Sequence, residues 1–149
     1  MLELDIKGRA GDFPIEAAFR SEAGATALFG RSGAGKTSIV DMLAGLRRPE
    51  AGRIAVDGEV LFDSEAGIDL PIERRRLGYV FQEARLFPHL TVAGNLSYGQ
   101  RLVPAGAANA DADRVIDLLD LRPLLERRPA GLSGGERQRV AIGRALLAA

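Results

Sequence analysis

A glycine-rich stretch between residues 30 and 37 has the residue types needed to hold a phosphate. It reads GRSGAGKT and matches the pattern G-x-x-x-x-G-K-[S/T] in full. Glycines let the backbone approach phosphate oxygens, and the amide N–H groups at the start of a following helix bind them. A plain strand–turn–helix joint would explain the glycines, but not a lysine charge at a helix N-terminus. The predicted phosphate-binding residues are Gly30, Arg31, Ser32, Gly33, Ala34, Gly35, Lys36, Thr37 and Ser38.

Two side chains of this stretch have predicted roles of their own. Lys36 reaches the β- and γ-phosphates of a nucleotide, and the hydroxyl of Thr37 is a ligand for Mg²⁺. Octahedral Mg²⁺ takes its other ligands from water and from phosphate oxygens. The sequence therefore predicts a site for a nucleotide with its magnesium ion.

A second glycine-rich stretch, LSGGE, occupies residues 132–136. Ser133 and Glu136 fit the capping box S-x-x-E, which would make this the start of a well-capped helix. Capping does not explain Gly134 and Gly135, since each glycine costs about 1 kcal/mol relative to alanine in a helix. Bare amides at a helix start suit an anion, but no lysine follows. We interpret Ser133, Gly134, Gly135 and Glu136 as half of a phosphate site, which would bind a phosphate that is already held elsewhere.

Strands must position these two stretches. Residues 2–6 alternate between apolar and polar, and residues 14–19 form a second candidate strand. Residues 25–29, ATALF, are apolar throughout and run into Gly30, which predicts a strand buried on both faces of a parallel sheet. Residues 77–81 predict a second buried strand. Asp57-Gly58 lies between two short apolar runs and predicts a hairpin.

Helices account for much of the remaining chain. Residues 39–46 have apolar side chains at helical spacing and predict a helix after the first glycine stretch. Residues 86–131 have the same spacing, with Asp111 or Asp113 as a helix start and residues 103–110 as a linker. We therefore expect a helical segment within an α/β framework.

Composition limits the class of protein. The chain has 149 residues, enough for one domain, with twenty basic and twenty acidic side chains. A zero net charge argues against a general nucleic-acid-binding protein. The absence of cysteine excludes disulfides and thiolate metal sites. There is no signal peptide and no run of eighteen apolar residues, so we expect a soluble, cytosolic chain.

The two glycine stretches together resemble a known family, the ATP-binding subunits of ABC transporters. LSGGE followed by Arg137-Gln138-Arg139 is similar to the family's signature, and GRSGAGKT to its nucleotide loop. Gln82, at the end of GYVFQ, matches the glutamine that the family places near Mg²⁺ and the attacking water. The resemblance implies an α/β fold of the P-loop nucleotide hydrolase type, as in ABC ATPases, with an antiparallel β subdomain and an inserted helical subdomain.

The resemblance also implies a division of the chain. Residues 1–149 would be a single partial ATP-binding domain: residues 1–85 form the α/β core with the β subdomain, residues 86–131 the helical subdomain, and residues 132–149 the signature helix. In relatives, an aspartate, a glutamate and a histidine needed for hydrolysis follow shortly after this point. We therefore expect a fold that is incomplete at its C-terminus, an unpaired apolar sheet edge, very slow ATP turnover and poor solubility.

The mechanism implied by the resemblance uses ATP and Mg²⁺. Two subunits form a head-to-tail homodimer, with ATP between the loop at residues 30–38 of one and the helix start at Ser133 of the other. Lys36 and Gln82 would be the catalytic residues of this chain, and Thr37 and Gln82 would be the metal ligands. In relatives an aromatic ring near the N-terminus stacks on adenine, and Phe13 is the candidate here.

The family also implies partners in and beside a membrane. Leu86, Phe87 and Leu90 would contact an integral-membrane permease, although ordinary core packing explains them equally well. The subunit would be peripheral on the cytoplasmic face of the membrane, with a solute-binding protein as a further partner and no nucleic acid. His89 and the three consecutive arginines at residues 74–76 receive no functional role, and the arginines are expected to be exposed.

The transported solute is indicated by one stretch. The sequence of residues 75–99, RRLGYVFQEARLFPHLTVAGNLSYG, most resembles the ATPases of molybdate importers. The ATPase of an importer for sulfate, iron or another small solute is the main alternative. An ABC-type ATPase without a permease, and a regulatory module that senses ATP without hydrolysing it, are alternatives from other classes.

Overall fold

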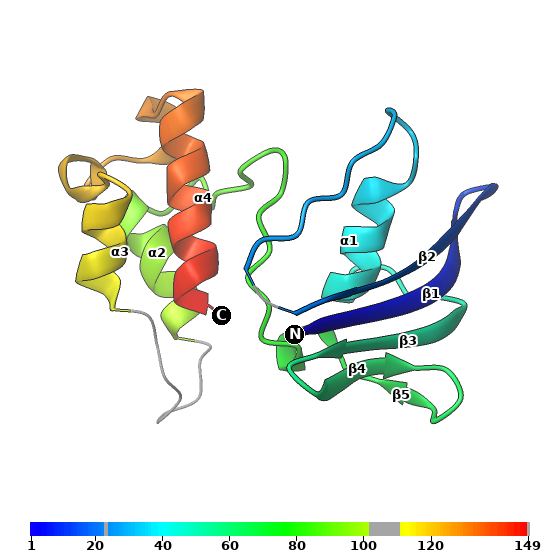
Figure 1. Cartoon of the computed structure of the whole chain (residues 1–149). Coiled ribbons are helices and arrows are strands. Elements are labelled where there is room, and N and C mark those ends of the chain that lie inside the picture. The colour runs from blue at the N-terminus through cyan, green and yellow to red at the C-terminus, as the bar shows by residue number, and fades with distance from the viewer. Residues whose placement is uncertain (23, 102–110, 149) are drawn as a thin grey trace. The chain divides into compact units, whose positions relative to one another are not determined.

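The computed structural model describes residues 1–22, 24–101 and 111–148. They fall into two compact units, Met1–Arg75 and Arg76–Ala149 (Figure 1). The boundary lies before residue 86, where the change to a helical pattern was predicted. The predicted linker at residues 103–110 lies outside the described residues.

The first unit contains a five-stranded sheet with the order β2-β1-β3-β4-β5. Every strand pair in it is antiparallel. The predicted alternation in the first strand is confirmed, because Leu4 and Ile6 are buried while Asp5 and Lys7 are exposed. The strands are β1 (Leu2–Ala10), β2 (Phe13–Ser21), β3 (Ala51–Val56), β4 (Glu59–Asp63) and β5 (Ile68–Asp69).

The predicted hairpin at Asp57-Gly58 is confirmed between β3 and β4. Both turn residues have positive φ, 48° at Asp57 and 85° at Gly58. A two-residue type I′ turn requires this conformation, and it matches the twist of the flanking strands.

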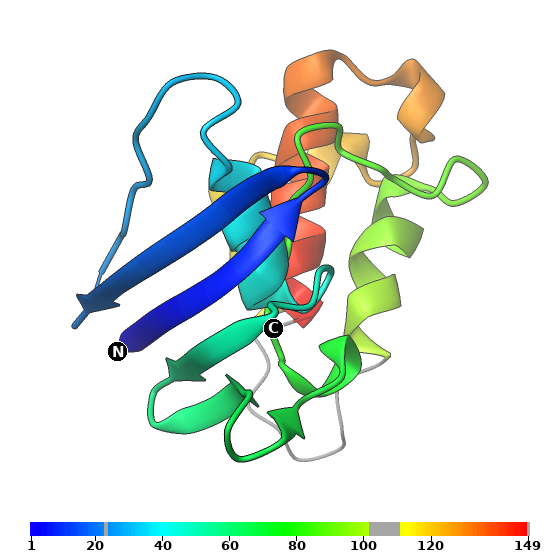
Figure 2. The ribbon, with the colours of Figure 1, turned by 90° about the vertical axis from the view of Figure 1, so that its right-hand side faces the viewer.

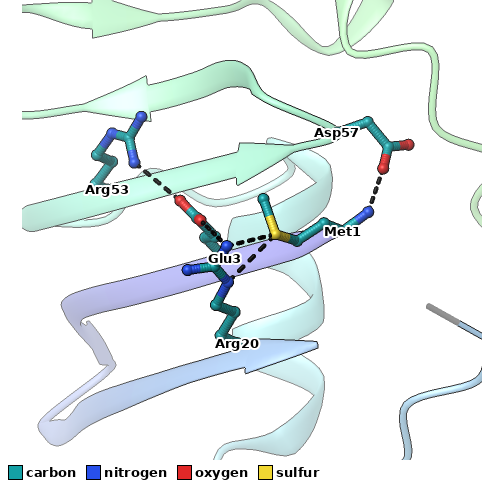
Figure 3. Close-up of polar contacts among 5 residues, drawn as sticks. All are labelled: Met1, Glu3, Arg20, Arg53 and Asp57. Carbon is teal, nitrogen blue, oxygen red and sulfur yellow. Dashed lines mark hydrogen bonds and ion pairs between the residues drawn. The ribbon is translucent and has the colours of Figure 1, made fainter. Parts of the chain in front are cut away.

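Charged side chains pair across the exposed face of the sheet (Figure 3). Glu3 on β1 lies opposite Arg20 on β2, with 3.4 Å between their charged atoms, and it also pairs with Arg53 on β3 at 3.1 Å. The N-terminal ammonium of Met1 pairs with Asp57. Each exposed pair contributes roughly 0.2–1 kcal/mol, so this row helps to hold the register without dominating stability.

Helix α1 (Lys36–Ala44) lies across one face of the sheet (Figures 1 and 2). Met42 is fully buried with Leu4 and Ile6 of β1. A Cβ at Gly8 would come within 2.5 Å of the Met42 Cε, so glycine allows this close approach. The helix ends two residues before residue 46, because Gly45 adopts φ 83° and caps it.

One of the three consecutive arginines is not exposed, which corrects the sequence prediction. Arg75 is only 4% exposed. Its guanidinium donates hydrogen bonds to the carbonyl oxygens of Met42 at 3.0 Å, Leu43 at 2.8 Å and Leu70 at 2.8 Å, and it pairs with Asp69 at 3.1 Å. The last carbonyls of a helix have no hydrogen-bond partner within the helix. The sequence of the three arginines gives no sign that one of them would bind the end of a helix more than thirty residues earlier.

The prediction of two parallel strands is wrong. Neither residues 25–29 nor residues 77–81 form a strand, and Phe29 is 92% exposed. An apolar run shows that a segment would be stable when covered, but a strand also needs a neighbouring strand to accept its hydrogen bonds. No strand among the described residues pairs with either segment.

The second unit is helical, as predicted for residues 86–131. It contains α2 (Val92–Gln100), α3 (Ala112–Leu118) and α4 (Gly134–Ala148), with short 3₁₀ helices η2 (Arg122–Leu124) and η3 (Pro129–Gly131) between α3 and α4. Asp111 caps α3 by accepting hydrogen bonds from the amides of Asp113 and Arg114, which confirms the predicted helix start. The first unit's own short 3₁₀ helix is η1 (Ile72–Arg74).

The helices of the second unit share one apolar core. Its buried members are Val92, Leu96, Val115, Leu121, Leu124, Leu132, Val140 and Leu147. Helices α2 and α4 meet closely, since a Cβ at Gly143 would come within 2.9 Å of the Leu96 Cδ2. Of the helices that the structure describes, none has the length and apolar character to cross a membrane.

Candidate functional site

The first glycine stretch forms a loop that leads directly into α1. Gly33 and Gly35 have φ of 82° and 84°, a left-handed conformation that strongly favours glycine. The helix begins at Lys36, and the amide of Ile39 donates to the carbonyl of Gly35 at 3.0 Å. The free amides of the first helical turn therefore lie at the end of this loop, as an anion site requires.

The side chain of Lys36 folds back over the loop. Its ammonium donates to the carbonyl oxygens of Gly30 and Arg31, each at 2.8 Å. These two bonds hold a positive charge beside the start of α1, where the helix dipole is also positive. An incoming anion can relieve this repulsion by taking over the lysine's hydrogen bonds.

An exposed aromatic ring lies next to the same loop. Phe13, at the start of β2, is 50% exposed. A Cβ at Gly35 would come within 3.7 Å of the Phe13 ring and 3.3 Å of Ile15. The hairpin of β1 and β2 thus brings the candidate adenine-stacking residue to the side of the phosphate loop.

The second glycine stretch forms the predicted capping box at the start of α4. The Ser133 amide donates to the Glu136 carboxylate at 2.6 Å, and the Glu136 amide donates to the Ser133 hydroxyl at 3.3 Å. The Ser133 amide, which donates to the carboxylate, lowers the pKa of Glu136 below its ordinary value of 4.5, and the Ser133 hydroxyl adds to this effect. Glu136 is thus a charged cap.

The packing of the described residues does not require the glycines of this stretch. A Cβ at Gly134 or Gly135 would meet no atom of the described residues within 4 Å, and neither glycine has a positive φ. Alanine would be the more stable choice in the first turn of a helix. What these positions provide is a bare backbone surface at a helix N-terminus, open to a group from outside the chain.

The segment after Gln82 is held by a buried asparagine that the sequence analysis missed. Gln82 itself is exposed. Asn95 on α2 is 0% exposed, accepts from the Phe87 amide at 2.8 Å, and donates to the carbonyls of Phe87 at 3.2 Å and Thr91 at 3.0 Å. A polar residue within the apolar spacing of residues 92–96 was the available signal.

Arg144 on α4 binds the same segment. Its guanidinium donates to the carbonyls of Ala84 at 3.3 Å and Arg85 at 3.0 Å, and lies 5.2 Å from the centre of the Phe87 ring. Burial lowers the pKa of Arg144 below its ordinary value. The helix that begins at the signature therefore holds residues 84–87 with its last turns.

The three candidate permease-contact residues are partly buried. Leu86 packs against the helical core, and the Phe87 ring lies 4.4 Å from the ring of Tyr98, centre to centre. Leu90 lies beside Gly94 at the start of α2. His89 is exposed, and its ring centre is 6.0 Å from that of Phe87.

The predicted residues form two separate groups. The phosphate loop, Lys36, Thr37 and Phe13 belong to the first unit, whereas Gln82, the segment after it and the signature belong to the second. Among the described residues no cluster of three or more histidine, cysteine or acidic side chains could hold a metal ion. Thr37 is exposed in the first turn of α1, which fits an ion carried mainly by nucleotide phosphates.

Comparison with known proteins identifies the family of this chain. A family model described as "ABC transporter" matches residues 19–149. The chain belongs to the ABC transporter family. The family assignment made from the two glycine stretches is thus confirmed.

Curated relatives align with nearly all of this chain. It is 61% identical over 148 residues to the molybdenum import ATP-binding protein ModC of Paramagnetospirillum magneticum, covering 99% of this chain and 41% of that protein. The ModC protein of Rhodospirillum rubrum is also 61% identical, with 99% and 40% covered. The chain therefore spans about two fifths of the length of these relatives.

Solved structures of ABC transporter cassettes confirm the fold class. One is a dimeric ATP-binding cassette in a post-hydrolysis state bound to ADP and Pi, with 26% identity, a TM-score of 0.71, and coverage of 99% of this chain and 70% of that one. Another is the ATP-binding subunit of an ABC transporter, with 27% identity and a TM-score of 0.77 over 99% and 62% of the two chains. The antiparallel sheet and the helices are consistent with the ABC ATPase fold.

Proposed function

We propose that the chain binds ATP with Mg²⁺ as part of the ATPase subunit of an ABC importer. The observation that carries this proposal is the pair of bare glycines, Gly134 and Gly135, which the packing of the part of the chain that the structure describes does not require. A complete phosphate loop at residues 30–38 and an incomplete one at the start of α4 are complementary halves of one site. Two copies in head-to-tail arrangement would supply both halves twice.

Each predicted residue has a definite task in this site. Lys36 exchanges its bonds to the carbonyls of Gly30 and Arg31 for the β- and γ-phosphates of ATP. Amides at the start of α1 hold the same phosphates, and the exposed Phe13 ring stacks on adenine. In the partner copy, the Ser133 hydroxyl and the amides of Gly134 and Gly135 bind the γ-phosphate.

Glu136 acts indirectly in this scheme. Its carboxylate already accepts the Ser133 amide, so it holds the turn that presents the two glycines instead of meeting the phosphate itself. A carboxylate in direct contact with the γ-phosphate would repel it. We therefore assign Glu136 to the geometry of the signature turn.

Two further residues would contact the Mg²⁺ ion and the attacking water. Thr37 would ligate Mg²⁺, and Gln82 would approach it from the segment that follows residue 81. Mg²⁺ neutralises developing negative charge on the transferred phosphoryl group when it is bound. Gln82 would orient the attacking water by accepting and donating hydrogen bonds through its carboxamide.

ATP would drive the importer through the dimer. A ligand that binds only the closed dimer stabilises it, and hydrolysis releases it. Residues 84–90, with Leu86, Phe87 and Leu90, would report closure to an integral-membrane permease. The protein would then work peripherally on the cytoplasmic face of the membrane, together with a solute-binding protein.

Dimerisation tests the shared site. Analytical ultracentrifugation with Mg-ATP should show the wild-type chain shifting from monomer to dimer, whereas Lys36→Ala should lose both ATP binding and the dimer. Ser133→Arg should keep ATP binding by the monomer and lose the dimer. Leu118→Arg adds the same side chain at a position that is 74% exposed on α3, and should behave as wild type. A Ser133→Arg variant that still dimerises with ATP would refute the head-to-tail arrangement.

Molybdate is the proposed solute, because the two relatives described above are both named as molybdenum import proteins. Deleting the gene should abolish uptake of labelled molybdate from dilute solution while leaving sulfate uptake unchanged. Loss of sulfate or iron uptake instead would transfer the proposal to another importer. Unchanged uptake of all three, with no permease recovered alongside the protein, would favour an ABC-type ATPase without a transport role.

A further inference from the structure

Helix α1 is held at the end opposite to the nucleotide loop. It has nine residues and is about 14 Å long. Lys36 and Thr37 lie in its first turn, and the carbonyls of Met42 and Leu43 in its last turn are bound by Arg75. Both bonds come from the same nitrogen, Nη1 of Arg75, which lies 33 positions after Met42 and 32 after Leu43, outside the helix.

The charge of Arg75 complements the dipole of α1, whose last turn contains no basic residue. No acidic residue occurs in the first turn of α1 and no basic residue in its last turn. A cation at the C-terminal end of a helix interacts favourably with the helix dipole, and arginine remains charged at neutral pH. Arg75 thus occupies the negative end of the dipole, while the positive end faces the phosphate loop.

Surrounding groups fix the guanidinium in place. The side chain of Arg75 is 2% exposed, and a Cβ added at Gly45 would lie 2.7 Å from its Nε atom. Asp69 binds it through one carboxylate oxygen at 3.1 Å and binds Arg48 through the other at 3.2 Å. The guanidinium therefore ties α1 to β5 in a single arrangement.

We infer that Arg75 is a positioning residue for the nucleotide: by clamping the last turn of α1 to Asp69 and Leu70, it sets the direction in which the helix presents Lys36 and Thr37. A short helix moves as a rigid rod, so a shift at one end displaces the other. The inference rests on the proposed function, since it assigns the clamp a consequence for ATP binding. Arg75 itself does not touch the nucleotide.

The test compares three variants of the chain. Arg75→Met keeps an unbranched side chain and removes all the donors, Arg75→Lys keeps a charge that can reach one or two of the acceptors, and Arg74→Met removes the exposed arginine next to it. Isothermal titration with Mg-ATP should give a Kd about tenfold weaker for Arg75→Met, about 1.4 kcal/mol. Arg75→Lys should be intermediate, and Arg74→Met should equal wild type.

A role of Arg75 in stability alone can be distinguished from a role in positioning by measuring Kd under conditions in which the variants are folded. At a temperature where circular dichroism shows Arg75→Met almost wholly folded, coupled unfolding hardly changes Kd. An unchanged Kd under that condition, with only a lower melting temperature, would overturn the inference. A tenfold weaker Kd in the folded variant supports it.

Hydrogen exchange provides a readout that needs no nucleotide. The Ile39 amide, bonded to the Gly35 carbonyl, reports on the first turn of α1. Its exchange should accelerate in Arg75→Met and not in Arg74→Met, and equal rates in the two variants would overturn the inference. A wild-type chain that binds no ATP would contradict the proposed function, and the exchange rates would still decide the role of Arg75.

Discussion

Ser133 and Glu136 hold each other at the start of α4 through two short local bonds, so the charge of one carboxylate supports a backbone turn. Because the bond from the Ser133 amide lowers the pKa of the Glu136 carboxylate, the cap stabilises the folded chain above pH 4.5 and loses this effect as the pH falls through the lowered pKa. We therefore expect Glu136→Gln to lower the melting temperature at pH 7, and the difference from wild type to vanish once the pH falls below the lowered pKa of Glu136.

A matched substitution separates the cap from a simple change of charge. Glu126 is exposed on the same unit, and Glu126→Gln removes one negative charge without touching the signature turn. Melting curves of both variants between pH 3 and pH 7 make the comparison. If Glu126→Gln shows the same pH dependence as Glu136→Gln, the effect belongs to net charge and the capping argument fails.

At the scale of elements, α2 and α4 hold the segment after Gln82 through Asn95 and Arg144. Asn95→Ala would leave the partly buried amide and carbonyl of Phe87 without this partner, and should reduce the free energy of unfolding by about 1–3 kcal/mol. Trypsin should also cut after Arg85 more rapidly, because the Phe87 carbonyl two residues further on loses its bond to Asn95. Urea unfolding and timed digestion measure the two effects.

Ser97→Ala is the matched control for this prediction. Ser97 lies on the same helix, and among the described residues its hydroxyl bonds only to the Gly94 carbonyl one turn earlier. Its loss should change stability by no more than about 0.5 kcal/mol and leave the digestion rate alone. Equal stability losses in the two variants would mean that Asn95 does not anchor the segment.

The elements that the sequence predicted correctly are those set by local chemistry. The Asp57-Gly58 turn, the caps at Asp111 and Ser133, and the loop before Lys36 each depend on residues within a few positions of one another. The strands at residues 25–29 and 77–81 could not be predicted in this way, since a strand depends on a partner elsewhere. The tasks of Arg75, Asn95 and Arg144 were missed for a related reason: key partners of Arg75 and Arg144 lie more than thirty positions away, and the apolar pattern of α2 hid Asn95.

At the scale of the whole molecule, the candidate residues are divided between two units with separate cores. The first unit contains a phosphate loop with a lysine, and the second contains a bare helix start without one. This division explains why neither glycine stretch alone indicated the family, while both together did. It also makes the ATP-dependent dimer the property on which the proposed function most directly depends.

The exposed position of Phe29 is suited to a fluorescent probe. Its ring is 92% exposed, immediately before the phosphate loop, and the sequence contains no tryptophan. An indole introduced at this position would be the sole tryptophan fluorophore of the chain, emitting without background from the segment that joins the sheet to the loop. Any partner strand, nucleotide or second copy that covers the segment would shift that emission towards the blue.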